Sequence, residues 1–319
     1  MKFIKPSVEY LPQKPGIGGI WHQIAIATRV CYQSKPREGE SDESFVKRVI
    51  LKPAQNGTYA DGKPMYNFNR MHGSVLEHGT VYLTLPNNRV GKDDIDDLIR
   101  NKYTEFIDPD DGFTYITTNM RVIVENYLEY LLNYYLSPRT VHIPRYTFSI
   151  ISNIGVTREL NRHRVNSPSE ESTRWCTYSA GKFGSEISYA EQDWMGSIYK
   201  RNVDVLSRMT KLQQLDAFKN WCKMIAESDI ENWTKESFLN FGLAASEFSY
   251  LGMKECHATN DEARTVLNLG TKTQEIVTAF GKDWLHFLEL RDEELSGHVH
   301  PDMKIIAKKI KEKSLKCFK

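Results

Sequence analysis

The chain has 319 residues, of which 40% are hydrophobic and 26% charged, enough to bury a sizeable core as one large domain or two modest ones. Its 42 Lys and Arg residues balance its 41 Asp and Glu residues, and a net charge of +1 excludes a global field that would attract a polyanion. No run of about 18 apolar residues predicts a membrane span, and no apolar stretch of signal-peptide length follows the N-terminus.

The first half of the chain alternates helix and strand patterns. Apolar residues at helical spacing predict a helix with one buried side over residues 17–32. Residues 33–64, rich in Gly, Pro and charged groups, are typical of a loop or an excursion from the core. Short β-branched and aromatic runs predict strands at residues 80–85 and 146–151, with a helical pattern between them at about 123–135.

The second half of the chain is expected to be mainly helical. Good helix formers predict a helix over residues 153–164, which Pro168 must end. Residues 203–250 and 261–290 are also helix-rich in pattern. No internal repeat is evident, and no glycine-rich motif of the common nucleotide-binding folds occurs. The pattern indicates mixed α and β structure in which helices predominate.

Residues 162–174 concentrate the groups expected of a site for an anionic ligand. The segment contains these cationic, acidic and hydroxyl side chains: Arg162, His163, Arg164, Glu170, Ser172 and Arg174. One guanidinium group can bind two phosphate oxygens at once, so phosphate is the ligand that this segment suggests. The first three residues alone would also suit a solvated helix end with cations near the C-terminal dipole. The residue types beyond Pro168 favour the binding site.

A second segment, residues 72–78, places two imidazoles, a hydroxyl and a carboxylate directly before a predicted strand. Its members are His72, Ser74, Glu77 and His78. Ser74 and Glu77 are three residues apart, which also suits a helix-capping box.

Together, the two segments resemble the flavin-dependent thymidylate synthases. That family carries Arg-His-Arg, seven residues and then Ser, which residues 162–164 and Ser172 reproduce. Its upstream His-x-Ser-x-x-Glu-His element is matched at residues 72–78, and its C-terminal element at residues 263–291. Residues 27–32 also resemble the family's N-terminal helix.

The resemblance implies an α+β, helix-rich single domain over residues 1–319 with a small antiparallel sheet. Relative to the compact family core, insertions are expected at about 33–64, 86–145 and 187–245, the last two helical. The implied reaction is the reductive methylation of dUMP to dTMP, with methylenetetrahydrofolate as carbon donor, FAD as hydride relay and NADPH as reductant. A homotetramer with shared active sites is the implied assembly.

The resemblance also implies roles for single residues. Flavin binding is expected at Ser74, Arg162, His163, Arg164, Glu170, Phe280 and His286. Nucleotide binding is expected at Glu159, Arg162, Glu170, Ser172, Arg174, Arg264 and Arg291. Arg264 would reach the substrate of a neighbouring subunit. Arg291 would be catalytic, since a cation against the uracil ring favours ionisation at N3 and makes C5 more nucleophilic.

The chain departs from the family pattern at three positions. Glu159 stands where many members have Gln, and an ionised Glu cannot donate a hydrogen bond to the nucleotide. Phe280 stands where an Asn commonly meets the flavin, so packing against the ring is expected instead. Asn268 replaces the usual Pro.

A cysteine-dependent thymidylate synthase is one alternative. Cys256 and His257 are neighbours, but Glu255 stands where that family has Pro, and an inert, partly buried thiol is the competing interpretation. The five cysteines are odd in number and contain no CxxC pair, which favours reduced thiols and a cytoplasmic location.

A nucleic-acid-binding module is the second alternative. It would use the basic loop of residues 162–174 and the tail of residues 304–319, which contains seven lysines. Isoleucines 305, 306 and 310 and Leu315 favour instead a terminal helix with one buried side and a solvated basic face. Nucleic-acid binding is therefore not expected.

A metal site is not predicted. His298, His300 and Asp302 are plausible ligand types, but their spacing suits a loop and no further strong ligand is near in the sequence.

Overall fold

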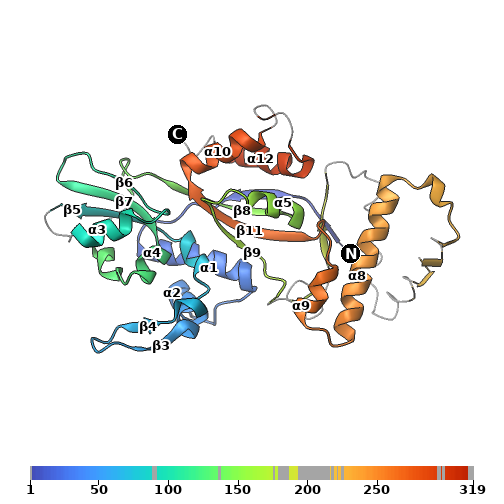
Figure 1. The fold of residues 1–319 in the computed structure, drawn as a ribbon, viewed down its shortest axis with the longest axis horizontal. Helices are drawn as coiled ribbons and strands as arrows, with labels where there is room; N and C mark the ends of the chain where they lie inside the picture. Colours follow the sequence, from blue (N-terminus) through green and yellow to red (C-terminus); the bar gives the residue numbers. More distant parts are fainter. Residues whose placement is uncertain are drawn as a thin grey trace.

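The computed structural model describes residues 2–87, 92–135, 138–174, 177–178, 187–192, 226–292 and 299–314, together with residues 216, 219–220, 222–223 and 296. The mixed helix and sheet architecture is shown in Figure 1. The predicted α+β class is confirmed.

A four-stranded antiparallel sheet lies at the centre of the molecule (Figure 1). Its order is β2 (Ser7–Tyr10), β8 (Arg145–Asn153), β11 (Lys272–Phe280) and β9 (Ser167–Glu170). One face carries Val277 and Ala279, which pack with Phe148 and Trp284 in a core closed by three helices. These helices are α5 (Ile154–Leu160), α10 (Gly281–Arg291) and α12 (Pro301–Ser314). The opposite face contacts α1 (Ile17–Tyr32), and its Ile276 joins a second, larger core.

A second antiparallel sheet has the order β5 (Thr80–Pro86), β7 (Phe113–Asn119) and β6 (Glu105–Ile107). Val81, Leu83 and Ile116 point from it into the core shared with α1. The elements around this sheet are the 3-10 helices η4 (Gly73–His78) and η5 (Glu129–Tyr134) and the helices α3 (Lys92–Ile99) and α4 (Met120–Glu125).

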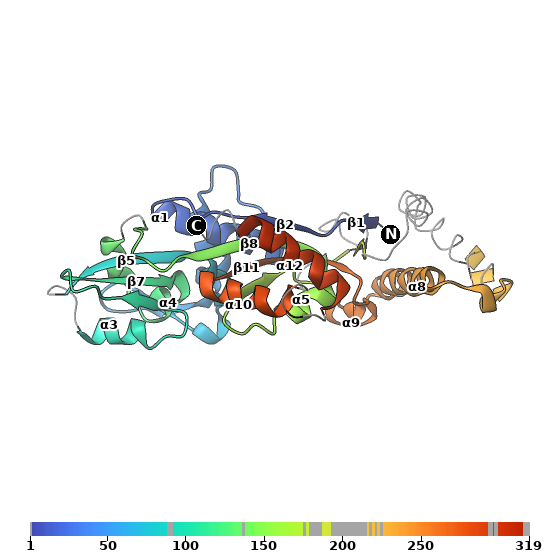
Figure 2. The same cartoon turned by 90° about the horizontal axis from the view of Figure 1, so that it is seen from above.

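The remaining elements lie outside these two sheets. β1 (Lys2–Ile4) pairs in parallel with β10 (Ser188–Ala190). After α1 come α2 (Asp42–Val46), η1 (Lys47–Leu51), η2 (Lys52–Ala54), the hairpin of β3 (Gln55–Thr58) and β4 (Pro64–Tyr66), and η3 (Phe68–Arg70). The described C-terminal half also has η7 (Ile230–Asn232), α8 (Lys235–Glu255), α9 (Asn260–Ala263) and η8 (Arg264–Val266). Helix α8 extends away from the central sheet, as Figure 2 shows.

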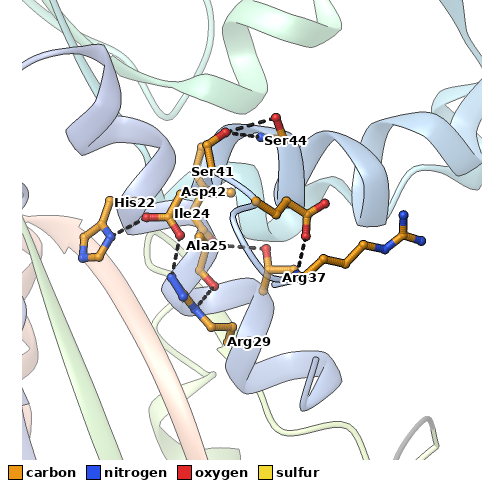
Figure 3. Close-up of polar contacts among 10 residues, drawn as sticks. His22, Ile24, Ala25, Arg29, Arg37, Ser41, Asp42 and Ser44 are labelled. Atoms are coloured by element: carbon orange, nitrogen blue, oxygen red, sulfur yellow. Dashed lines mark hydrogen bonds and ion pairs between the residues drawn. The ribbon is translucent and has the colours of Figure 1, made fainter. Parts of the chain in front are cut away.

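The segment that follows α1 is fixed to that helix by a polar junction (Figure 3). The Asp42 carboxylate accepts a hydrogen bond from Arg29 at 2.9 Å and lies 2.7 Å from His22 Nδ1. The Ser41 hydroxyl caps α2 by accepting a hydrogen bond from the Ser44 amide at 3.2 Å. The start of the segment is therefore ordered against the core.

The two sheets repeat one arrangement. In the three-stranded sheet, and in the last three strands of the central sheet beside β2, the order is first, last and middle in chain sequence, all antiparallel: β5-β7-β6 and β8-β11-β9. Glu105 opens β6 and pairs with Thr117, two residues before β7 ends; Ser167 opens β9 and pairs with Thr278, two residues before β11 ends. Both central strands run directly into a helix, α4 or α10. The two sheets therefore share one strand topology, which the sequence pattern did not predict.

Several local predictions are confirmed. The helix over residues 17–32 is α1, and the strands expected at residues 80–85 and 146–151 are β5 and β8. The expected pattern near residues 123–135 is divided into α4 and η5, because Tyr127 between them has φ 56°.

Other predictions were wrong. The helix expected over residues 153–164 ends at Leu160, before the cationic triplet. Residues 33–64 contain α2, two further helical turns and a hairpin, and residues 86–145 contain β6 and β7 in addition to helices. The segment 261–290, predicted to be helix-rich, contains the central strand β11. The prediction failed because Ile276, Phe280 and Trp284 fall by coincidence at helical spacing across the junction of β11 and α10. The single-domain boundary and the status of these segments as insertions stay predictions.

Replacing Gly19 with Ala should lower the free energy of unfolding by about 2–3 kcal/mol, because a Cβ there would overlap the Lys14 carbonyl. Gly18→Ala is the matched control: no atom lies within 4 Å of its added Cβ, so helix propensity should raise stability by up to about 1 kcal/mol. Urea denaturation of both variants measures the difference. Equal stabilities would contradict this packing.

Candidate active site

An open pocket of about 520 Å³ lies between the turn that follows α5 and one face of α10. This volume is within the usual range for small-molecule sites. Five predicted site residues line it: Arg162, His163, Arg164, His286 and Arg291. Trp284, Phe287 and Leu290 supply apolar walls. The pocket therefore combines cationic donors with apolar walls, which suits a ligand with both phosphate groups and flat rings.

Arg291 forms an ion pair within this pocket. Its Nη1 lies 3.3 Å from Oε2 of Glu159, and its side chain is 22% exposed. Its Nε is buried and has no hydrogen-bond partner among the described residues. Glu159 therefore orients the guanidinium while leaving donor capacity for a ligand.

His163 is an uncharged member of the pocket. Burial lowers the pKa of its imidazole, and the neighbouring Arg291 and His286 lower it further. The ring packs edge-on against Phe287 with centroids 5.0 Å apart, and Nε2 has no partner in the described structure. His286 is 63% exposed, with Nδ1 3.5 Å from Glu289. A neutral imidazole at His163 can give or accept one hydrogen bond.

Arg145 connects the two sequence segments singled out above. From the first residue of β8, its guanidinium donates to the Glu77 carbonyl at 2.9 Å and to the Ser167 hydroxyl at 3.3 Å. It is only 8% exposed and lies 5.5 Å from the centroid of the Phe280 ring. One buried cation thus joins η4, β9 and the start of α10.

The motif at residues 72–78 lies on the other face of the sheet from the pocket. His78 Nδ1 is 2.8 Å from the Thr278 hydroxyl, on the face of β11 opposite Ala279. Burial, with the charge of Arg145, lowers the pKa of His78 to about 3. The preceding residue, Glu77, forms an ion pair with Arg121 at 2.6 Å. Ser74 is exposed on η4.

Arg174 and Arg264 meet at a separate surface. Arg174 Nε lies 3.0 Å from Asp261, and Arg264 Nη1 lies 3.9 Å from the same carboxylate oxygen. The Ser172 amide donates to the Cys31 carbonyl at 3.2 Å. None of these three predicted nucleotide ligands lines the pocket described above. The chain therefore brings the two guanidiniums together, with Asp261 as their present counter-ion.

Two other predicted residues are buried or largely buried, Phe280 and Glu170. Phe280 is 4% exposed and packs beneath Arg145, so its expected contact with the flavin stays a prediction. Glu170 is largely buried and is hydrogen-bonded to Thr157 at 2.9 Å. Arg145 and Glu275 were not predicted from the sequence, although an Arg beside a predicted strand and a Glu directly before the apolar pair Ile276 and Val277 were visible signals.

The described residues include no group of three or more His, Cys, Asp and Glu side chains that could hold a metal ion. His298 lies outside the part of the chain that the structure describes, and Asp302 accepts a hydrogen bond from Asn153 at 2.8 Å. No helix among the described residues has the length and apolar character to cross a membrane.

The expected basic tail is a helix with a buried side. Ile306 and Ile310 of α12 are both fully buried, as predicted, while Leu315 falls outside the described residues. Cys256 follows α8 and is exposed, so the expected partial burial of this thiol was wrong. Half-buried Met253 in the last turn of α8 still packs against a core, whereas the helix end at Glu255 and Cys256 is exposed.

The family model for thymidylate synthase complementing protein, Thy1, matches residues 94–318, more than half of the chain. The chain belongs to the Thy1 family. The resemblance to flavin-dependent thymidylate synthases is thereby confirmed at the level of the family. No curated protein sequence matches the chain.

Two solved structures are similar to the Thy1-family chain at a low level. They are a UMP/dUMP methylase, PolB from Streptomyces cacaoi, bound with 5-Br UMP, and PolB bound with 5-Br dUMP. Each is 13% identical and covers 99% of this chain, with TM-scores of 0.38 and 0.39 and with 92% and 93% of the other chain covered. Likeness at this level has no functional weight, and family membership rests on the family model.

In this Thy1-family chain, Arg145→Met should lower the free energy of unfolding by about 3 kcal/mol, because Glu77 and Ser167 would lose a buried donor. The matched control is Lys282→Met, which removes a 60% exposed partner of Glu105 and should cost under about 1 kcal/mol. Thermal or urea denaturation measures both. Similar losses in the two variants would show that Arg145 is not the link between these elements.

Proposed function

We propose that this Thy1-family protein catalyses the reductive methylation of dUMP to dTMP, with methylenetetrahydrofolate as carbon donor and NADPH as reductant. The single observation that carries this proposal is that the Arg-His-Arg triplet and Arg291, far apart in the sequence, line one pocket. The cofactor would be FAD, which supplies hydride transfer when bound. Cationic side chains, apolar walls and the unpartnered Nε2 of His163 fit such a group.

Each pocket residue would have a defined task. Arg162 and Arg164 are exposed at the pocket and would hold phosphate oxygens of the flavin cofactor. Neutral His163 would exchange one hydrogen bond with the cofactor without adding charge. Arg291, oriented by Glu159, would place its positive charge against the uracil ring and stabilise the negative charge that develops there.

Arg174, Arg264 and Ser172 would bind the nucleotide phosphate. A phosphate would replace Asp261 as the counter-ion of the two guanidiniums, which are 65% and 43% exposed. Because these residues do not line the same pocket as Arg291, we propose that a complete site forms between subunits of a homotetramer. The odd number of cysteines and the absence of a CxxC pair in the sequence favour the cytoplasm as its location.

The experiment that tests the function begins with purified protein and added FAD. Bound flavin should absorb in the visible range and bleach with NADPH, and dUMP with methylenetetrahydrofolate should then yield thymidylate. Arg291→Met should lower kcat by about 100-fold or more, since a charge that meets the transition state is lost. Lys282→Met, on the same helix but outside the pocket, should stay within about 2-fold of the unchanged enzyme. A protein that takes up no FAD and forms no thymidylate would refute the proposal.

The cysteine-dependent alternative makes the opposite prediction for Cys256. No role for a thiol nucleophile is required in the proposed reaction, so Cys256→Ala should retain full activity within about 2-fold. The measurement is thymidylate formation at saturating dUMP. Complete loss of activity, with flavin still bound, would favour the cysteine-dependent mechanism.

The nucleic-acid-binding alternative has weaker support. Arg174 is paired with Asp261, which partly neutralises its charge toward a polyanion, and the apolar side of α12 is buried in the core. Salt-sensitive retention of an oligonucleotide without flavin would favour it.

A further inference from the structure

Two glutamates lie side by side on neighbouring strands of the central sheet. Glu170 of β9 and Glu275 of β11 are directly paired in the antiparallel register, so their side chains project from the same face. The Glu171 amide donates to the Gln274 carbonyl at 2.9 Å, which makes the adjacent Glu170–Glu275 position a non-hydrogen-bonded pair. In that geometry, opposing side chains are closest, with Cα atoms about 4.5 Å apart.

The pair is buried without a cation. Glu275 is 0% exposed, and neither of its carboxyl oxygens makes a hydrogen bond of ordinary geometry among the described residues, although Asn161 is near. No Lys, Arg or His of the described chain forms an ion pair with either carboxyl within 4.0 Å. Lys272, on the same strand, is bound to both oxygens of Glu171 at 2.8 and 2.9 Å. Two ionised carboxylates in this position would repel each other strongly.

The hydrogen bond to Glu170 from α5 carries no charge. The Thr157 hydroxyl donates to Glu170 Oε1 at 2.9 Å and lies 3.1 Å from the Ile154 carbonyl. A hydroxyl is a neutral donor, so this contact does not neutralise a carboxylate as an ion pair would.

The groups around the pair act on the pKa of each carboxyl in known directions. Burial raises the pKa of Glu170, Glu171 adds to the rise, and hydrogen bonds from Thr273 and Thr157 oppose it. Arg158 on α5 is exposed and opposes the rise only weakly. Burial, then the charge of Glu170, holds the pKa of Glu275 well above its usual range. The nearby phenol of Tyr178 is kept neutral by its own burial.

We propose that Glu170 and Glu275 form one protonated pair at neutral pH, and that Glu275 is a positioning residue that limits the negative charge Glu170 presents to an anionic nucleotide. The ligand half of this inference rests on the proposed function and on the role that the family resemblance implies for Glu170, contact with both flavin and nucleotide. A pair that kept no proton would oppose the phosphate groups that Arg162, Arg164 and Arg174 attract.

The first test needs no ligand. An infrared spectrum of the protein at neutral pH should contain the carbonyl band of a buried carboxylic acid, and Glu275→Gln or Glu170→Gln should each diminish it. In the unfolded chain, such a carboxyl loses its proton near pH 4.5, whereas the folded pair keeps it to higher pH. The folded state then binds more protons, so stability falls as pH rises above 4.5, and Glu275→Gln should flatten that fall by up to one proton.

A control with the opposite sign is available. Hydrogen bonds from Arg48 lower the pKa of Glu40 to about 2, so this carboxylate adds stability above its usual pKa and loses it as pH falls. Glu40→Gln should therefore lower stability at neutral pH and leave the carboxylic acid band unchanged. If Glu275→Gln behaves like Glu40→Gln, or if the unchanged protein shows no acid band, the protonated pair is refuted. Glu170→Gln provides the same test if Glu275→Gln does not fold.

The second test concerns the ligand. The dissociation constant of dUMP should increase as pH rises through deprotonation of the pair, and it should increase less in Glu170→Gln and Glu275→Gln, which never hold two negative charges there. A pH dependence identical in all three proteins refutes the ligand role of the pair. A protein that binds no dUMP at any pH refutes the proposed function, while the infrared and stability results still decide whether the pair holds a proton.

Discussion

The sheet built on β11 must bury ionisable groups on both of its faces. At one end, Arg145 lies over Phe280 and donates hydrogen bonds to η4 and β9; at the other, Glu275 faces Glu170 beneath α5. Buried ionic groups are stable only when neutralised or hydrogen-bonded, so each end requires a particular neighbour. Arg145 requires the Glu77 carbonyl, which fixes the motif at residues 72–78 against the sheet. The positions of residues 72–78 and of β9 thus depend on the buried side chains of β8 and β11.

This arrangement explains why the predicted site residues form separate groups. The triplet follows α5 and meets α10 on one face of the sheet, while Ser74 is on η4, whose last residue, His78, contacts the opposite face. Arg174 and Arg264 converge near α9, beyond the end of the sheet strands. A sheet keeps its two faces apart, which is why the proposed function takes one set of ligand contacts from another chain.

The sequence predicted those features that depend on local patterns. Helix α1 follows from its apolar spacing, and β5 and β8 follow from short β-branched runs, because one buried face is enough to impose each pattern. The spacing of the triplet and Ser172 identified the family. By contrast, β11 is buried on both faces and lacks alternation, and Ile276, Phe280 and Trp284 imitate a helix. Arg145 and Glu275 were missed because their importance arises from partners far away in the sequence.

The repeated topology of the two sheets has a consequence for the route by which the chain folds. In the first copy, β5 and β7 join Pro86 to Phe113, 27 positions apart, whereas in the second β8 and β11 join Asn153 to Lys272, 119 positions apart. Closing the longer loop costs more entropy before any contact rewards it. The same supersecondary unit therefore occurs once as a local structure and once as a non-local one, and the local copy can form early. With α1 packed on it, that copy offers a preformed surface on which the later strands are ordered.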